Sequence, residues 1–338
     1  MAHSKNPNEI VPLSEESKNI IRQVQTNFLP PDDFVHVGPK RYMCSKLYEK
    51  YKDEIYNFQI KNTDVWVNSY GRSGTTVTQE MVWQICNNLD FEKASKTPLI
   101  ERFPFFEFAI YHSEEMESFL QKHANDPKKC ASIKKLFTLE WEKTKVPEKR
   151  FFKSHLPLSL LPAEITKVAK IVYTARNPKD MAVSGYHFIK MYEDPPKFKK
   201  YWNLWERDLM LQQPYFEHII EAWNIRNKEN IFFLFYEDFV KDIRGTVVKL
   251  CKFFGKTYSD AQIDKLVDHL KIDNFRNNSS VNRDYFDYYP PKVENFVRRG
   301  KVDSHKDEVF TNELSKKADK WIQEQYKKTD MRFPNIPY

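Results

Sequence analysis

Glycine is scarce in this chain, which has 7 glycines among 338 residues, or about 2% where about 7% is usual. This scarcity excludes collagen-like and glycine-rich low-complexity sequences, and it disfavours a β-barrel that turns at glycines. No stretch approaches 18 apolar residues, so we expect no transmembrane helix. The first 17 residues lack the apolar core of a secretory signal, and we expect a cytoplasmic protein.

Closely spaced cysteines are missing as well. Cys44, Cys86, Cys130 and Cys251 lie far apart and form no CxxC pair, so a disulfide framework or a zinc site is not expected. Long runs of lysine and arginine are also missing, although the formal net charge is +7. Nucleic-acid-binding proteins more often concentrate their charge, so a small anionic ligand in one basic pocket fits this composition better.

Short apolar segments alternate with helical patterns along the chain. Residues 64–70, 170–176 and 230–236 are rich in β-branched and aromatic residues, which is typical of strands buried on both faces of a parallel sheet. A further strand is predicted at 150–154, and helices are predicted at 75–88, 214–227, 246–254, 260–270 and 311–327. This alternation predicts a single α/β domain over residues 21–338, with a central, mainly parallel sheet flanked by helices, after an N-terminal tail over residues 1–20.

Two of the seven glycines fall in the segment Ser69-Tyr-Gly-Arg-Ser-Gly-Thr-Thr76, at a predicted strand-to-helix turn. A helix N-terminus preceded by such a loop offers backbone N–H groups and a positive dipole end to a phosphate. The loop resembles a Walker A motif but differs from it, because that motif would place Gly at position 69 and Lys at position 75. Taken alone, the segment is also compatible with an ordinary glycine turn.

Three further motifs follow predicted strands or precede a glycine. His155, in Lys153-Ser-His-Leu-Pro157, stands at the carboxyl end of a strand, where it could be a general base or a structural histidine. Arg176 ends another strand, Ser184 lies about two helical turns further on, and Arg298-Arg-Gly300 adds a basic pair. Each motif alone suits a surface or structural role. Together, five cations at one sheet edge suit a nucleotide with two separated phosphate groups: Arg72, Lys153, Arg176, Arg298 and Arg299.

In their order and spacing, these motifs resemble the cytosolic sulfotransferase family. The segment 69–76 is similar to its 5′-phosphosulfate loop, usually Tyr-Pro-Lys-Ser-Gly-Thr-Thr, and Lys153-Ser-His-Leu-Pro is similar to its Lys-Thr-His-Leu-Pro. Arg176-Asn-Pro-Lys-Asp with Ser184 resembles its 3′-phosphate motif, and Arg298-Arg-Gly resembles its Arg-Lys-Gly. The resemblance covers roughly residues 35–330. The strings Arg-Ser-Gly-Thr-Thr, Leu-Pro-Leu-Ser-Leu, Pro-Tyr-Phe-Glu-His and Leu-Phe-Tyr-Glu-Asp look most like the insect branch that includes retinol dehydratase.

The resemblance implies in-line transfer of a sulfuryl group from 3′-phosphoadenosine 5′-phosphosulfate (PAPS) to a hydroxyl of a small apolar acceptor (a phenol, sterol or other alcohol). The product nucleotide is PAP, and no metal is implied. His155 would be the general base, with Lys153 and Arg72 beside the transferring group. The donor would be held by Arg72, Ser73, Gly74, Thr75, Thr76, Val77, Arg176, Ser184, Tyr236, Phe275, Arg298, Arg299 and Gly300, and the acceptor by Phe105 and Phe188.

The chain departs from the family pattern at several positions. Val77 stands where the family has a tryptophan that stacks on adenine, and Arg72 replaces a lysine with a planar guanidinium. The dimer motif reads Lys306…Thr311-Asn312…Lys316, so we expect a monomer or an atypical dimer, with no nucleic-acid or membrane partner.

Other functions stay open at this point. An allylic acceptor could lose its sulfate ester and become dehydrated. A non-catalytic nucleotide-binding or ligand-binding protein of the same fold is the alternative. A nucleotide kinase would need the Walker lysine, and Thr75 argues against it.

Overall fold

A parallel sheet of four strands lies at the centre of the computed structural model, which describes residues 9–24, 30–112, 116–137, 149–191, 194–281, 296–307 and 309–336. Its strand order is β5-β4-β6-β7, and each neighbouring pair is parallel. The strands are β4 (Val65–Asn68), β5 (Phe151–Ser154), β6 (Lys170–Ala175) and β7 (Ile231–Phe235). These are the four predicted strands, so the expected α/β fold is confirmed.

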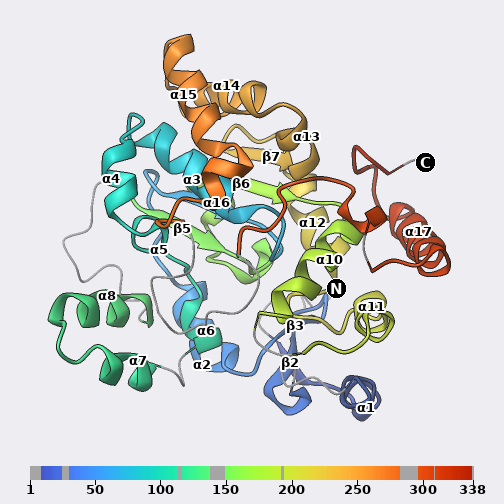
Figure 1. The fold of residues 1–338 in the computed structure, drawn as a ribbon. Helices are drawn as coiled ribbons and strands as arrows, with labels where there is room; N and C mark the ends of the chain where they lie inside the picture. Colours follow the sequence, from blue (N-terminus) through green and yellow to red (C-terminus); the bar gives the residue numbers. More distant parts are fainter. Residues whose placement is uncertain are drawn as a thin grey trace, which may run out of the picture.

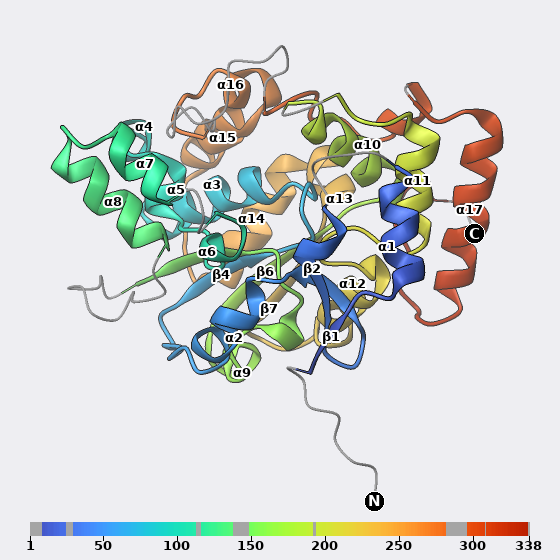
Figure 2. The same ribbon diagram turned by 90° about the horizontal axis from the view of Figure 1, so that it is seen from below.

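Helices cover both faces of this sheet (Figure 1, Figure 2). The helices are α1 (Glu15–Arg22), α2 (Tyr48–Tyr56), α3 (Thr75–Cys86), α4 (Phe91–Lys96), α5 (Leu99–Arg102), α6 (Phe108–His112), α7 (Met116–Lys122), α8 (Pro127–Phe137), α9 (Ile165–Val168), α10 (Pro178–Ile189), α11 (Phe198–Glu206), α12 (Tyr215–Asn224), α13 (Tyr236–Lys241), α14 (Ile243–Phe253), α15 (Asp260–Leu270), α16 (Ile272–Arg276) and α17 (Asn312–Tyr326). The helix predicted at 246–254 begins earlier, at Ile243, because the Asp242 side chain caps it by accepting from the backbone N–H of Gly245 at 2.7 Å.

The continuous apolar strands follow from burial on both sheet faces. Val65 and Val67 of β4 pack in one hydrophobic cluster with residues of α3, α14 and α15. Trp66, which points the opposite way, belongs to a second cluster with residues of α2, α9 and α12. Each β4 side chain is therefore buried, whichever face it takes.

A second, antiparallel sheet near the N-terminus was not predicted. It has the order β1-β2-β3 and consists of β1 (Ile10–Pro12), β2 (Phe34–Val37) and β3 (Tyr42–Ser45). Two backbone hydrogen bonds join β3 to the segment before α12, from Met43 N to Gln213 O at 2.8 Å and from Gln212 N to Met43 O at 2.7 Å.

Strand β1 and most of α1 fall within residues 1–20, the segment expected to be a tail, whereas Ile10 and Val11 pair with β2 and are partly buried. The predicted boundary between a tail over residues 1–20 and a single domain over residues 21–338 stays a prediction. Among the described residues, no helix is long and apolar enough to cross a membrane.

Candidate active site

The segments singled out in the sequence meet at one edge of the parallel sheet. Asn68 of β4 is in register with Ser154 of β5, and Ala175 of β6 is in register with Phe235 of β7. The residues that follow these strands therefore emerge at the same edge, where ligands bind in open α/β sheets.

A cavity of about 1550 Å³ opens at this edge. Sixteen of the predicted site residues line it: Arg72, Gly74, Thr75, Thr76, Val77, Phe105, Lys153, His155, Arg176, Ser184, Phe188, Tyr236, Phe275, Arg298, Arg299 and Gly300. Ser73 is the exception, because its side chain is fully buried beneath the loop. The cavity exceeds the usual volume of a small-molecule site, roughly 300–1,000 Å³, so it has room for two ligands side by side.

The loop between β4 and α3 is shaped by one glycine. Gly74, the residue before α3, has a φ of +92°, a conformation that glycine adopts at little cost. A Cβ atom at this position would lie 2.4 Å from Cδ2 of Tyr236, so the tyrosine ring packs directly on the glycine. Beneath the loop, the hydroxyls of Ser69 and Thr75 are hydrogen-bonded at 2.6 Å. The loop thus presents the first turn of α3 to the cavity.

Two arginines meet at this loop: Arg72 belongs to it, and Arg176 follows β6. The Arg72 guanidinium lies over the rings of Phe188 and Phe296, at 5.0 and 4.7 Å from the ring centroids, and its Nε donates to Ser184 Oγ at 3.3 Å. The Arg176 guanidinium lies 4.6 Å from the Tyr236 ring centroid and donates to the Arg72 carbonyl at 3.1 Å. Because aromatic faces and carbonyl oxygens neutralise only part of a guanidinium charge, both side chains still favour an anion.

His155 follows β5 and is fixed through its ring and its backbone. Its Nδ1 lies 2.8 Å from the Ser69 carbonyl oxygen. A carbonyl oxygen can only accept, so Nδ1 carries the proton of the neutral ring and Nε2 carries the lone pair. The backbone N–H donates to Glu107 Oε1 at 2.6 Å, and the backbone carbonyl accepts from His218 Nε2 at 3.0 Å.

The aromatic wall beside His155 is built from a short extension of the sheet. Phe105 forms a parallel bridge with Lys153, and the Lys153 ammonium lies 4.1 Å from the Phe105 ring centroid. The Phe105 ring also meets His155 edge to face at 5.3 Å and stacks on Tyr111 at 5.8 Å. Gln212 Nε2 donates to the Tyr111 hydroxyl at 2.8 Å. This part of the cavity is therefore mainly aromatic, with one polar pair.

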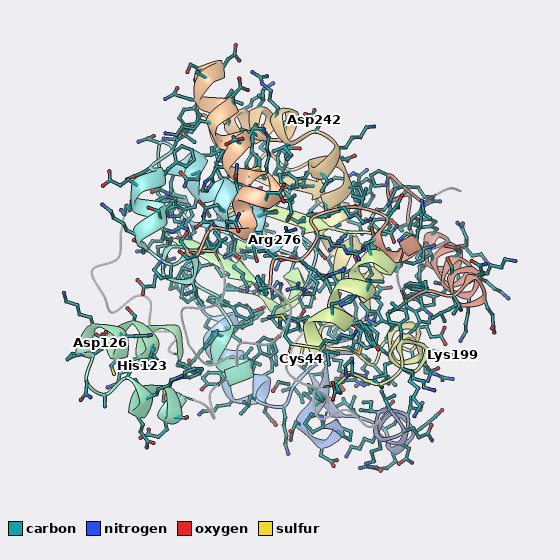
Figure 3. All side chains as sticks on the ribbon, viewed as in Figure 1. Cys44, His123, Asp126, Lys199, Asp242 and Arg276 are labelled. Carbon is teal, nitrogen blue, oxygen red and sulfur yellow. The ribbon has the colours of Figure 1, made fainter. Side chains whose placement is uncertain are left out.

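The segment that carries Arg298 and Arg299 is held in place from α16 and α10. Arg276, labelled on α16 in Figure 3, donates to the Arg298 carbonyl at 2.6 Å. Gly300 has a φ of +62°, and a Cβ atom there would lie 2.4 Å from Cδ1 of Ile272. These contacts bring the basic pair to the cavity on the side of α16.

The same segment is anchored further on by Asp180 of α10. This carboxylate is fully buried, and it accepts from the backbone N–H groups of Asp303 at 2.7 Å and His305 at 3.0 Å. It also lies 2.7 Å from His305 Nδ1. Burial alone would raise the pKa of Asp180, but these hydrogen bonds and the charge of Arg176 outweigh it and lower the pKa.

The position of the missing tryptophan is occupied by aliphatic side chains. Val77 packs in the cluster that contains Val240 and Ile243, and all three line the cavity together with Phe275. A planar base entering here would meet these side chains and the ring of Tyr236.

Several residues of the site were not predicted from the sequence. Glu107 and Glu237 are buried carboxylates that accept backbone N–H groups beside His155 and Arg176, and burial raises the pKa of each to about 7. His218 is fully buried, and its desolvation lowers its pKa. These roles become visible only in the structure, because each side chain is distant in sequence from the backbone group that it contacts.

The first turn of α3, His155 and four arginines thus line one cavity at the carboxyl ends of the strands. The comparison with known proteins agrees. Residues 62–330 match the family model of the sulfotransferase domain. The chain belongs to the sulfotransferase family, and the expected enzyme class is confirmed.

The relatives include an insect enzyme and two solved structures. The luciferin sulfotransferase of Photinus pyralis is 32% identical over 321 residues, which cover 91% of this chain and 84% of that protein. Two crystal structures of retinol dehydratase are similar over 98% of this chain and 100% of theirs, with identities of 38% and 35% and TM-scores of 0.83 and 0.86. The first is in complex with androsterone and inactive cofactor PAP, and the second with retinol and PAP. The expected likeness to the branch that includes retinol dehydratase is confirmed.

Proposed function

We propose that this sulfotransferase uses PAPS as donor, sulfates a hydroxyl of an apolar alcohol, and uses His155 as its general base. The observation that carries this proposal is the placement of His155. Its Nδ1–H is committed to the Ser69 carbonyl at 2.8 Å, so the proton-accepting nitrogen is Nε2. His155 lines the same cavity as the first turn of α3 and the arginines.

The donor set fits a nucleotide with separated phosphate groups. Gly74 leaves the backbone uncovered where a Cβ atom would collide with Tyr236, and the N–H groups at the start of α3 suit the 5′-phosphate. Arg176, Ser184 and the pair Arg298–Arg299 line the same cavity and suit the 3′-phosphate. We place the adenine beside Val77, Tyr236 and Phe275. Ser73, which is buried, would support the loop from within.

The chemistry follows from these positions. The acceptor oxygen forms a bond to sulfur, the bond between sulfur and the oxygen of the 5′-phosphate breaks, and the acceptor proton moves to Nε2 of His155. Negative charge grows on the leaving phosphate oxygen, and cations fixed beside it lower the barrier. Arg72 and Lys153 take this role in our proposal.

The acceptor side of the cavity favours an elongated apolar alcohol. It is lined by Phe105, Ile110, Tyr111, Phe188, Ile189, Met210 and Leu211. The structural relatives support this class, because they bind androsterone and retinol. An alcohol seated here would place its hydroxyl toward His155 and its apolar body against these side chains.

The test is PAPS turnover with a panel of phenols, sterols and allylic alcohols, with products identified by mass spectrometry. We expect a sulfate ester from at least one apolar alcohol, formed with PAPS and absent when PAP replaces it. A protein that binds PAP but sulfates no member of the panel would contradict the proposed function.

Allylic alcohols form a separate arm of the panel. Their sulfate esters ionise readily because the carbocation is delocalised, and loss of a proton then gives an alkene. With retinol we expect a dehydrated product that requires PAPS, and with the saturated analogue we expect only the ester. The likeness to retinol dehydratase favours this outcome. A stable retinyl sulfate would limit the function to simple sulfation.

The phosphate loop gives a separate prediction. Gly74→Ala should weaken PAP binding at least tenfold, because alanine at a φ of +92° is strained by about 1–2 kcal/mol and its Cβ displaces the Tyr236 ring. Calorimetric titration with PAP measures the effect. Gly255→Ala is the matched control, because Gly255 has a φ of +64° but no atom within 4 Å of its Cβ position. Unchanged PAP affinity in Gly74→Ala would contradict the assignment of this loop.

A further inference from the structure

Two buried glutamates occupy equivalent positions beside His155 and Arg176. Glu107 Oε1 accepts the backbone N–H of His155, the residue that follows β5, at 2.6 Å. Glu237 Oε1 accepts the backbone N–H of Asn177, the residue after Arg176, at 2.8 Å. The exposed fractions of the two side chains are 1% and 4%. Each carboxylate therefore holds the chain just after a strand ends.

The same two strand ends are held from the other side by one helix. His218 of α12 donates from Nε2 to the His155 carbonyl at 3.0 Å, and Tyr215, three residues earlier on α12, donates its hydroxyl to the Arg176 carbonyl. The peptide groups around both functional residues are thus fixed by a carboxylate acceptor on one side and an α12 donor on the other.

These carboxylates are costly to bury. Desolvation disfavours the charged form, which raises the pKa of both groups to about 7. Nearby charges offset part of this cost, from Lys153 at Glu107 and from Arg176 at Glu237. A carboxylate acceptor makes a shorter and stronger hydrogen bond than a neutral one. Burial of these carboxylates therefore lowers the stability of the fold, and their hydrogen bonds fix the positions of two short loops.

We propose that Glu107 and Glu237 are positioning residues, Glu107 for the base His155 and Glu237 for the phosphate-binding Arg176. This inference rests on the proposed function. The two residues affect different steps. Glu107 positions the base that removes the acceptor proton, and Glu237 positions an arginine that binds the nucleotide. Loss of either acceptor would let one loop shift, and a displacement of about 1 Å can cost about 100-fold in rate.

The experiment compares Glu107→Leu with Glu237→Leu in the full chain, each serving as the control for the other. For E107L we expect kcat to fall at least about tenfold, while the Kd for PAP stays within about twofold. For E237L we expect the Kd for PAP to rise at least about tenfold and kcat to fall less than in E107L. The glutamine variants retain an acceptor oxygen, so E107Q should recover most of the lost kcat and E237Q most of the lost affinity.

Thermal unfolding of each variant separates positioning from folding. If a leucine variant does not fold, the aspartate variants E107D and E237D replace it, because they keep the charge but shorten the reach by one methylene. The same split between kcat and PAP affinity is expected from them. Equal effects of the two variants on both parameters, or no effect of either, would overturn the inference. Failure of the proposed function looks different, because wild type would then bind PAP and form no sulfated product.

Discussion

His155→Ala is expected to turn over at least about 100-fold more slowly than wild type, while PAP affinity stays within about twofold. A positioned general base contributes roughly 10²–10⁴ in rate, and alanine leaves no acceptor for the hydroxyl proton near neutral pH. The donor should still bind, because the groups that we assign to the 5′-phosphate lie at the start of α3, whereas His155 meets the Ser69 carbonyl at the beginning of the loop. Steady-state kinetics and calorimetric titration with PAP give the two quantities.

Two further variants separate base chemistry from structure. In His155→Asn, the side-chain amide can still donate to the Ser69 carbonyl, so the local hydrogen bond survives while the nitrogen that accepts the proton is lost. This variant should be as slow as His155→Ala. His123 lies between α7 and α8 (Figure 3) and does not line the cavity, so His123→Ala should retain wild-type kcat. Near-normal turnover by His155→Ala would show that the base lies elsewhere.

The convergence of the motifs could be predicted from the sequence because it follows from chain topology. Residues 64–70, 170–176 and 230–236 predict strands by composition, residues 150–154 are predicted as a further strand, and parallel strands bring their carboxyl ends to one edge. The segment before Thr75, His155, Arg176 and Tyr236 each follow one of these strands. The resemblance to a known family then assigned a role to each residue.

The supports of the site could not be predicted in the same way. Glu107 lies among phenylalanines at 103–108 and shows no pattern of its own, and its partner is 48 residues away along the chain. His218 and Tyr215 share one face of α12, but the carbonyl groups that they meet belong to the residues that follow β5 and β6. A single sequence does not show which backbone group a side chain will bond, because almost every residue supplies the same carbonyl and N–H groups.

The N-terminal sheet escaped prediction for another reason. Strands β1, β2 and β3 form a separate antiparallel sheet, outside the alternation of buried strands and helices that predicted the parallel sheet. Their positions depend on contacts with distant segments, such as the two hydrogen bonds between Met43 and residues 212–213.

The largest effect on stability is expected from Glu80, a fully buried carboxylate on α3. It accepts from Arg102 of α5 at 2.8 Å, from His269 of α15 at 2.9 Å and from Gln84 at 2.9 Å. Glu80→Ala leaves the buried Arg102 guanidinium without this partner. Removing one member of a buried ion pair costs about 3–5 kcal/mol, which urea unfolding at neutral pH measures.

An exposed ion pair of similar length provides the control. Lys96 and Glu92 lie 2.6 Å apart, with exposed fractions of 70% and 80%, and Glu92→Ala should change stability by less than about 1 kcal/mol. The double variant Glu80→Leu/Arg102→Met removes both buried charges and should recover part of the loss. A loss of less than about 1 kcal/mol in Glu80→Ala would contradict the stabilising role of this cluster.

The pH dependence of the same variant tests the electrostatic origin of the effect. Burial alone would raise the pKa of Glu80, but the hydrogen bond from His269 and the charge of Arg102 outweigh it, so that the pKa falls below its ordinary value of 4.5. A carboxylate with a lowered pKa in the folded state stabilises fully above the unfolded value, and the contribution is lost as pH falls through the folded value. The stabilities of wild type and Glu80→Ala should therefore differ most near neutral pH and approach each other in acid. Because the loop that we propose for the 5′-phosphate leads into the first turn of α3 and Glu80 lies on its second turn, this cluster also ties that loop to α5 and α15.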